Sequence, residues 1–182
     1  MTVVAAQALP TGTWNADATH SSINFSVKHM AISTFRSGFD DVDAGVTVGE
    51  DGAAVLVGTA RAASIRLADE NLAVHVASAE FFDSEAHPEI TFRSTSLDRD
   101  EDRLDVDGSL TIKGITRPVK ASGAVTDVIE DPYGGSRFAL TLQTTVDRRE
   151  FGLEWNAPLP KGGFALGNDV TLEIVLELVK AG

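Results

Sequence analysis

The sequence has no cysteine, and it has only 15 lysine and arginine residues against 27 aspartate and glutamate residues in a chain of 182. The lack of cysteine excludes disulfides, thiolate nucleophiles and cysteine-bound zinc. The shortage of basic residues leaves a net charge of −12. This charge argues against nucleic acid or an anionic membrane surface as a partner, because both would repel the chain. Long hydrophobic runs are also absent, and stretches such as AAVLVG are far too short to span a membrane.

The N-terminal segment lacks the features of a targeting signal. MTVVAAQALPTGTW has an apolar patch, but no basic residue precedes it and the patch is too short for a signal sequence. We therefore expect a cytoplasmic protein with a flexible N-terminus over residues 1–11. Residues 12–182 are enough for one domain with a sizeable core and short for two, and the hydrophobic content is ordinary for a folded protein.

The motifs of the common enzyme classes are missing as well. There is no G-x-S-x-G nucleophile elbow, no P-loop and no G-x-G-x-x-G motif, and GGFALG lacks the required spacing. The four histidines show no His-x-x-x-His or similar spacing for a zinc site. We expect no enzyme, no cofactor and no metal site, and a small-molecule enzyme stays open only as a less favoured alternative.

What the sequence does contain is alternation of apolar and polar residues, the pattern of a β-strand with one buried face. In HSSINFSVKH, residues 20–29, the side chains of Ile23, Phe25 and Val27 fall on one face, and the same face ends on His29. Two explanations are open. Either the face lines a hollow interior that meets a polar rim, or the strand ends there and His29 turns to solvent.

The alternation recurs in six further segments, which are residues 42–48, 53–60, 89–95, 103–112, 137–146 and 170–179. Burial on one face favours antiparallel strands over parallel ones. Gly108 interrupts an apolar face and indicates a bulge or a bend, and DRDEDR, residues 98–103, is expected to form a solvated turn. Only residues 66–82, which show helix-forming residues and no alternation, predict one or two helical turns.

About eight to ten strands with one helical interruption near residues 66–80 predict an all-β fold, either an antiparallel barrel or a sandwich. The inner face carries Phe25, Phe39, Phe92 and Phe138 together with many aliphatic residues. A closed barrel of about eight strands is either just filled by side chains or holds one small ligand. The function therefore depends on whether the interior is full.

A set of motifs in fixed order is similar to one known family. The motifs are DATHSSINFSVKHM, GFDD, HVASAEFFDSEAHPEITFRST, DGSLTIKGITRPV, DRREFGLEWN and LGNDVTLEI. Together they resemble the YceI-like family over nearly the whole chain, from Trp14 to Val179. The resemblance implies a single lipocalin-like antiparallel β-barrel domain whose pocket binds a polyisoprenoid, an isoprenoid quinone or a fatty-acid derivative. It implies no catalytic activity, it makes a homodimer a candidate assembly, and it connects the protein with stress responses.

The residues expected to line this pocket are inward-facing side chains of the predicted strands and motif residues near its mouth. They are Phe25, Val27, His29, Phe39, Val57, His75, Ile90, Phe92, Leu110, Phe138, Leu140, Leu142, Arg148, Phe151, Trp155, Leu172 and Ile174. The chain departs from the family at Leu72 and Ala73, where many members carry an Arg-Asp pair ahead of the histidine that corresponds to His75. Many members are also exported.

Three of the polar candidates have two interpretations each. His29 and His75 either contact the polar head of a ligand or have ordinary structural roles. Arg148, within RREFG, either pairs with a carboxylate of the barrel wall or meets a ligand head. Trp155 and Asn156, in GLEWN, resemble an anchor at a strand end, and the indole of Trp155 can equally form pocket wall.

The other two histidines are expected to have local roles. His20 is predicted to form a hydrogen bond near Ser21 and Ser22, and His87, which precedes Pro88, is predicted to be a turn residue.

The leading hypothesis is a protein that binds, transports or sequesters a long-chain apolar lipid. The net charge favours a neutral head group, such as a quinone or an amide, unless Arg148, Lys28 or other basic residues gather at the mouth. One alternative is a barrel filled by its own side chains that binds another protein, and the other is a small-molecule enzyme.

Overall fold

The structure is a computed structural model that describes residues 8–182. The predicted flexibility of residues 1–7 therefore lies outside the described residues. Leu9 is buried and the Trp14 indole donates a hydrogen bond to the Pro10 carbonyl, so packed structure begins before residue 12. The elements are β1 (Gly12–Ala16), β2 (Ser22–His29), β3 (Ser33–Gly38), β4 (Val42–Val48), β5 (Ala54–Arg61), η1 (Ala62–Ser64), α1 (Glu70–Ala77), β6 (Glu89–Asp100), β7 (Arg103–Ile112), β8 (Ile115–Val125), β9 (Ile129–Glu130), β10 (Ser136–Asp147), η2 (Arg148–Phe151) and β11 (Leu166–Lys180).

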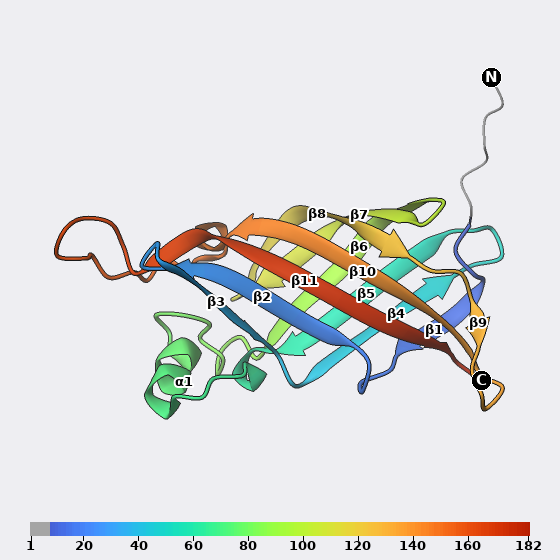
Figure 1. The fold of residues 1–182 in the computed structure, drawn as a ribbon, viewed down its shortest axis with the longest axis horizontal. Helices are drawn as coiled ribbons and strands as arrows, with labels where there is room; N and C mark the ends of the chain where they lie inside the picture. Colours follow the sequence, from blue (N-terminus) through green and yellow to red (C-terminus); the bar gives the residue numbers. More distant parts are fainter. Residues whose placement is uncertain (1–7) are drawn as a thin grey trace, which may run out of the picture.

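Eight strands close into an antiparallel barrel (Figure 1). Around the wall the hydrogen-bonded order is β1, β4, β5, β6, β7, β8, β10 and β11, and β11 pairs again with β1. The long strand β11 has two partners on that side, because its last residues pair with β1 whereas Leu166–Val175 pair with β2. β2 and β3 therefore continue the wall beyond the end of β1. The predicted all-β antiparallel barrel is confirmed.

The helical segment lies at one end of the barrel, away from the C-terminus (Figure 1). The Asp69 side chain accepts a hydrogen bond from the Leu72 backbone N–H at 2.9 Å, which is a common way to cap the first turn of a helix. The chain before α1 is tied to the barrel. The Arg66 backbone N–H donates to the Gly38 carbonyl at 2.9 Å, and the Arg66 guanidinium donates to Asn24 Oδ1 at 2.7 Å. The predicted short helix near residues 66–80 is confirmed.

The opposite end of the barrel is filled by side chains. The rings of Trp14 and Phe138 pack edge to face with centroids 4.9 Å apart, a geometry worth about 0.5–1.5 kcal/mol beyond the buried area. Leu104, Leu140 and Leu178 are fully buried around this aromatic pair. The packed core thus occupies the end of the barrel where the chain terminates.

Gly108 lies beside a bulge, as its place in the pattern predicts. It pairs with Ser94 of β6, and the register between β6 and β7 shifts between Ser94 and Ser96. A Cβ atom on Gly108 would lie 2.5 Å from Cε2 of the Phe92 ring and 2.7 Å from the Arg93 carbonyl oxygen. The glycine therefore makes room for the Phe92 ring on the inner face.

The charged segment 98–103 differs from the prediction. β6 continues to Asp100 and β7 begins at Arg103, so only two residues form the turn. Arg99 lies opposite the buried residue Leu104 and is itself only 8% exposed. Its guanidinium donates to Asp127 Oδ1 at 2.6 Å. The expectation of a fully solvated turn is wrong for Arg99, because the strand continues and alternation places its side chain on the inner face.

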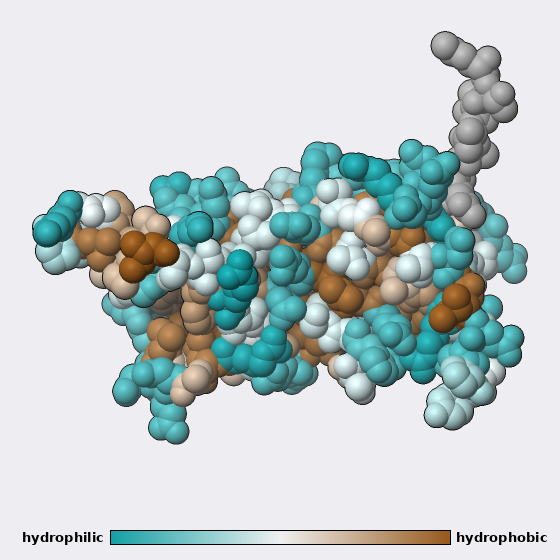
Figure 2. Space-filling model, viewed as in Figure 1, coloured by the Kyte–Doolittle hydropathy of each residue, from teal (hydrophilic) through white to brown (hydrophobic). Residues whose placement is uncertain are grey.

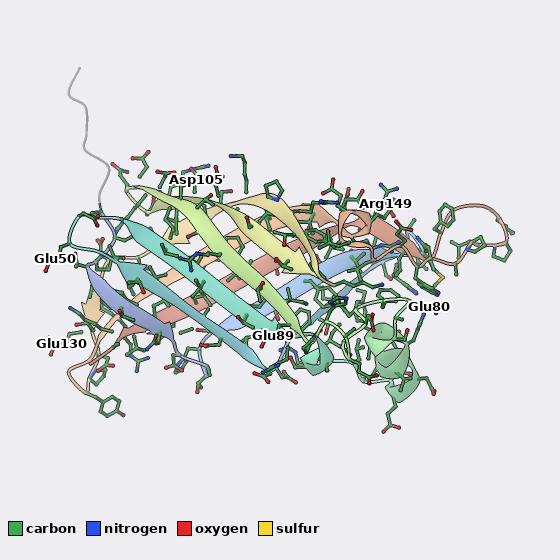
Figure 3. All side chains as sticks on the ribbon, turned by 180° about the vertical axis from the view of Figure 1, so that it is seen from behind. Glu50, Glu80, Glu89, Asp105, Glu130 and Arg149 are labelled. Carbon is green, nitrogen blue, oxygen red and sulfur yellow. The ribbon has the colours of Figure 1, made fainter. Side chains whose placement is uncertain are left out.

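The outer surface carries the net negative charge of the chain. The barrel wall is mostly hydrophilic (Figure 2), and Glu50, Glu89, Asp105 and Glu130 lie around its outside (Figure 3). Exposed apolar side chains occur as well, among them Phe164 on the loop that precedes β11 and Ile129 of β9.

Candidate ligand-binding cavity

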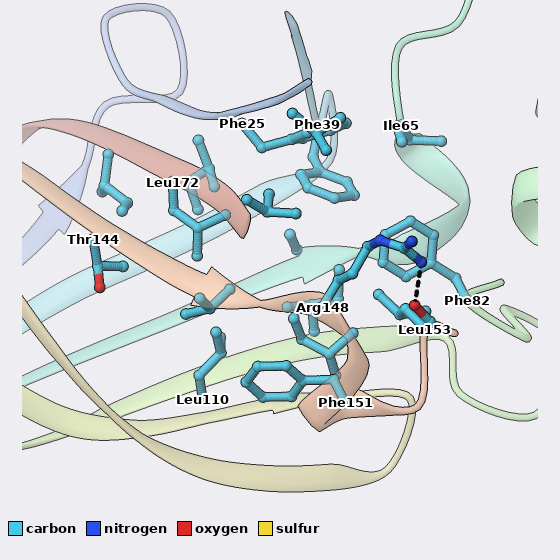
Figure 4. A pocket seen from close by; sticks show the side chains of 18 of the residues that line it. Phe25, Phe39, Ile65, Phe82, Leu110, Thr144, Arg148, Phe151, Leu153 and Leu172 are labelled. Atoms are coloured by element: carbon cyan, nitrogen blue, oxygen red, sulfur yellow. Dashed lines mark hydrogen bonds between the residues drawn. The ribbon is translucent and has the colours of Figure 1, made fainter. Parts of the chain in front are cut away.

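An apolar cavity of about 640 Å³ occupies the end of the barrel near α1. This volume lies within the range of roughly 300–1,000 Å³ that is usual for small-molecule sites. Side chains of β2, β7, β10 and β11 point into it, as Phe25, Leu110, Thr144 and Leu172 show (Figure 4). The barrel is hollow at this end, which contradicts the alternative of a barrel filled by its own side chains.

Most of the residues predicted from the sequence do line this cavity. On β2, the alternating set Ile23, Phe25, Val27 and His29 faces the interior, so the apolar face of that strand reaches the cavity rim. The predicted residues that line the cavity are Phe25, Val27, His29, Phe39, Val57, His75, Ile90, Phe92, Leu110, Leu142, Arg148, Phe151, Trp155, Leu172 and Ile174.

Two predicted residues lie elsewhere. Phe138 and Leu140 belong to the packed end of the barrel, where they are 2% and 1% exposed. Leu142 and Thr144, farther along the inner face of the same strand, do line the cavity. Alternation identifies which side chains of β10 face the interior, but it does not show at which residue along the strand the packed core ends and the cavity begins. The prediction is therefore wrong for Phe138 and Leu140.

Val57 requires a correction of its orientation. It contributes to the lining, but its side chain is 41% exposed. In the β4–β5 register, the buried residues Val46 and Leu56 pair with each other, whereas Val57 pairs with Gly45 on the outer face. The run AAVLVG is apolar at both alternations, so the pattern alone did not indicate which set of side chains points inward.

The segment around α1 supplies cavity residues that the sequence analysis missed. Leu72 and Val76 of α1 line the cavity, followed by Phe81 and Phe82. The rings of Phe82 and Phe39 meet edge to face with centroids 6.3 Å apart. The spacing of Leu72 and Val76, four residues apart on a helix, is the signal that could have identified this covering face.

His75 forms part of an aromatic group at the cavity edge. Its ring lies edge to face with Trp155 at 4.7 Å and with Phe81 at 5.4 Å between centroids. Its Nε2 atom is 3.2 Å from Glu80 Oε2. The structure therefore gives His75 and Trp155 a packing role that joins α1 to the loop after η2, and both residues also face the cavity.

Arg148 lines the cavity as a buried cation. Its Nε atom donates to the Gly167 carbonyl at 2.8 Å, and Nη1 donates to the carbonyls of Trp155 at 2.8 Å and of Leu153. Among residues 8–182, no carboxylate lies within ion-pair distance of this guanidinium, so the predicted pairing with a wall carboxylate is wrong. Burial lowers the pKa of Arg148, and the nearby charge of Asp147 partly offsets that change.

Asn156 anchors a strand end, as predicted. Its Nδ2 donates to the Leu166 carbonyl at 2.8 Å, and its Oδ1 accepts from the Leu166 N–H at 2.9 Å and from the Ala157 N–H at 3.0 Å. This side chain therefore imitates a β-bridge partner for Leu166. It holds both ends of the loop 157–165 at the mouth of the cavity.

The remaining histidines lie apart from the cavity. His20 lies 3.1 Å from Asp17 Oδ2, which replaces the predicted bond near Ser21 and Ser22. Asp17, His20 and Glu177 are close enough to hold a cation, but the Arg137 guanidinium already binds both carboxylates at 2.8 Å.

His87 packs beside Gly114, where a Cβ would come within 2.8 Å of its ring. It follows the turn in which its backbone N–H donates to the Asp83 carbonyl at 2.8 Å. Its predicted place at a turn is confirmed.

The fold and the cavity define a class of protein: a small antiparallel β-barrel that encloses an apolar space the size of a small ligand. The YceI-like domain model matches residues 14–178, and the chain belongs to this family. A UPF0312 protein of Staphylococcus aureus (strain N315) is 32% identical over 164 residues, which cover 88% of this chain and 94% of the relative.

Solved structures share the fold at low sequence identity. BcnA of Burkholderia cenocepacia is 22% identical with a TM-score of 0.73, and the match covers 91% of this chain and 99% of BcnA. A polyisoprenoid binding domain from Saccharophagus degradans is 13% identical with a TM-score of 0.68, and the match covers 95% and 100% of the two chains. Within residues 8–182, none of the helices is long and apolar enough to cross a membrane.

Proposed function

We propose that this protein binds one long-chain apolar lipid in the barrel cavity and carries or sequesters it without altering it chemically. The cavity itself is the observation that carries the proposal, because it is large and apolar and lies inside a barrel whose other end is solidly packed. A structural neighbour described as a polyisoprenoid binding domain supports an apolar chain as the ligand. Polyisoprenoids, isoprenoid quinones and fatty-acid derivatives share such a chain. Cytoplasmic residence and homodimerisation remain predictions.

The driving force for binding is the removal of the lipid tail from water. Enclosing on the order of 400 Å² of tail at about 25 cal/mol per Å² contributes roughly 10 kcal/mol. The loss of freedom on association costs about 4–15 kcal/mol. A long tail therefore binds and a short tail does not, and selectivity follows the length and bulk of the tail more closely than its bond chemistry.

The direct test is mass spectrometry of the purified protein, both intact under native conditions and as an organic extract. We expect a complex with one lipid per chain, and a long-chain lipid in the extract at matching amount. A protein that is isolated empty, and that stays empty when offered prenyl quinones, fatty acids and fatty amides, would contradict the proposal.

A substitution in the cavity wall tests where the tail lies. Ala121 of β8 lines the cavity, whereas Ala124 of the same strand is exposed on the outside. We expect Ala121→Leu to weaken binding of the longest ligands by about tenfold, because the added methylenes displace tail from the cavity, and Ala124→Leu to have no effect. Native mass spectrometry with prenyl alcohols of increasing length measures both. Equal effects of the two substitutions would place the tail outside the barrel.

A further inference from the structure

Arg148 is the one charged side chain that is buried in the wall of the cavity among residues 8–182. It is the first residue of η2, directly after β10, and it is 4% exposed. Figure 4 shows its guanidinium among the apolar side chains at the mouth end, near the carbonyl of Leu153. A buried charge costs free energy unless it is paired and hydrogen-bonded, so its partners are informative.

One nitrogen of the Arg148 guanidinium lacks a hydrogen-bond acceptor among the described residues. A guanidinium has five N–H groups. The Nε and Nη1 groups donate to the carbonyls of Gly167, Leu153 and Trp155, whereas Nη2 has no acceptor among the described residues. Every fully enclosed side-chain nitrogen or oxygen of those residues has a hydrogen-bond partner. Nη2 is therefore not fully enclosed by protein, and it belongs to a side chain that lines the cavity.

The positive charge is only partly compensated by the protein. The neighbouring carboxylate of Asp147 is bound by Arg149, with Nη2 of Arg149 2.6 Å from Asp147 Oδ2, and this contact holds the pKa of Asp147 at about 2. The carboxylate of Glu80 contacts His75 Nε2 at 3.2 Å and forms no ion pair with Arg148. Within the described residues, three neutral carbonyl groups therefore bind the guanidinium of Arg148, no carboxylate forms an ion pair with it, and the nearby charge of Asp147 compensates it only in part.

We infer that Arg148 is the head-group anchor of the cavity, and that the lipid bound there ends in a carboxylate, one oxygen of which accepts a hydrogen bond from Nη2 of Arg148. This inference rests on the proposed function and narrows it to long-chain acids, straight or isoprenoid. The tail extends from Arg148 toward Leu56 and Leu176 at the floor of the cavity, next to the packed core.

The charge balance selects a carboxylate over the other head groups. A single negative charge neutralises the single cation, and the charge-assisted bonds are strong in a desolvated site. A neutral quinone or amide leaves the cation unpaired. A diphosphate brings further negative charges that meet no second buried cation in the cavity wall among residues 8–182, within a chain of net charge −12. The composition of the chain favoured a neutral head group, but the fold brings the cation of Arg148 into the cavity. We therefore expect an anionic head group instead.

The anchor is also rigid before the ligand arrives. Three carbonyls, two from the connection after η2 and one from Gly167 of β11, fix the plane of the guanidinium, so little side-chain entropy is lost when a carboxylate binds. Because Nε and Nη1 are already occupied, Nη2 is the donor left for the head group, which predicts a carboxylate held through a single N–H···O bond and not by the two-nitrogen fork.

Oleic acid and oleyl alcohol, which share one tail, test the inference against delipidated protein at neutral pH. We expect the wild-type protein to bind the acid about 10- to 100-fold more tightly than the alcohol. Arg148→Met and Arg148→Gln should bring the ratio of the two dissociation constants close to one while alcohol binding persists. The control Lys28→Met, which removes an exposed cation on β2 whose Nζ bonds Thr34 at 3.0 Å, should keep the wild-type ratio.

The ratio within each variant separates anchoring from a merely structural role, because a damaged cavity weakens both ligands together. A second measurement needs no variant: the carboxyl signal of [1-¹³C]oleic acid in the wild-type complex should remain that of the ionised form below the ordinary carboxyl pKa of about 4.3. Equal binding of acid and alcohol by the wild-type protein, or an acid preference that survives in both Arg148 variants, would overturn the inference and leave the proposed function standing. Binding of neither ligand would overturn the proposed function as well.

Discussion

At the scale of single residues, the inner surface of the cavity depends on side chains that are absent as well as on those present. Phe92 pairs with Gly58 of β5 on one side, and Gly108 of β7 lies close on the other. The two glycines differ in the space around them. A Cβ on Gly58 would have no neighbour closer than 4.0 Å, whereas a Cβ on Gly108 would collide with the Phe92 ring.

Alanine at the two positions should therefore have different effects. We expect Gly108→Ala to lower the free energy of unfolding by about 1–3 kcal/mol, because the Phe92 ring or the strand must move, and Gly58→Ala to change it by less than about 0.5 kcal/mol. Urea unfolding of both variants measures this difference. Equal destabilisation would show that strand glycines matter here for backbone reasons and not for the Phe92 ring.

The sequence predicted the residue types of the cavity better than their partners. The position of His29 at the cavity rim could be predicted from alternation alone, because alternation along one strand decides which face each side chain is on. The partners of Arg148 could not be predicted, because Leu153, Trp155 and Gly167 meet it only after the connection that follows η2 has folded back onto the barrel end and β11 has paired there.

At the scale of elements, the mouth of the cavity is formed by connections together with the ends of β2 and β3. The loop 157–165 is held by Asn156, whose side chain makes three hydrogen bonds to backbone groups at its two ends. Among the described residues, the one strand partner of Leu166 is His29 of β2. The side chain of Asn156 therefore supplies the hydrogen bonds on the other side of Leu166.

We expect Asn156→Ala to loosen this loop selectively. The substitution leaves backbone groups of Leu166 and Ala157 without their partners, at a cost of about 1–3 kcal/mol. Amide hydrogen exchange at Leu166 and proteolysis within 157–165 should accelerate, while exchange at the packed end, for example at Leu104, should stay slow. Asn15→Ala, at an exposed position of β1, is the matched control. Uniform acceleration throughout the barrel would assign Asn156 a global role instead.

Element predictions from the sequence succeeded where one periodicity dominated. β4 spans the predicted residues 42–48, and the helical interruption contains α1. They were incomplete where both alternations are apolar, as on β5 around Val57, and where one face serves two environments, as on β10 between Leu140 and Leu142.

At the scale of the whole molecule, Arg137 joins segments that are far apart in the chain. Its Nη1 donates to Asp17 and Glu177 at 2.8 Å, and its Nε donates to Asp131 at 2.7 Å. The hydrogen bonds from Arg137 hold the pKa values of Asp17 and Asp131 below their usual range. His20 lies beside Asp17 and belongs to the same cluster.

This cluster should make stability depend on pH under acid conditions. A carboxyl whose pKa is lower in the folded state stabilises the fold above its unfolded pKa of about 3.9 and loses that contribution as the pH falls toward the folded value. We expect Arg137→Met to be less stable than the wild type at pH 7, and the difference to shrink between about pH 4 and pH 2. Thermal unfolding across this range measures it.

Arg61→Met is the matched control, because Arg61 and Glu89 form an exposed pair with 3.3 Å between Nη1 and Oε1, and such surface pairs contribute little. A difference between wild type and Arg137→Met that stays constant down to pH 2 would show that Arg137 contributes through packing and not through these carboxylates.

The sequence by itself determined most of the strands and the short helix, because alternation and helix-forming residues are local properties of the chain. Alternation left a barrel and a sandwich open, and the barrel was predicted from the resemblance to the YceI-like family. Only the tertiary structure decided which end of the barrel is solid and which is hollow. That choice depends on Trp14 and Phe138 meeting across the interior from strands distant in sequence, and on α1 and the loops enclosing the other end. The tertiary structure also brought one unpaired cation, Arg148, into an apolar cavity, which no periodicity encodes.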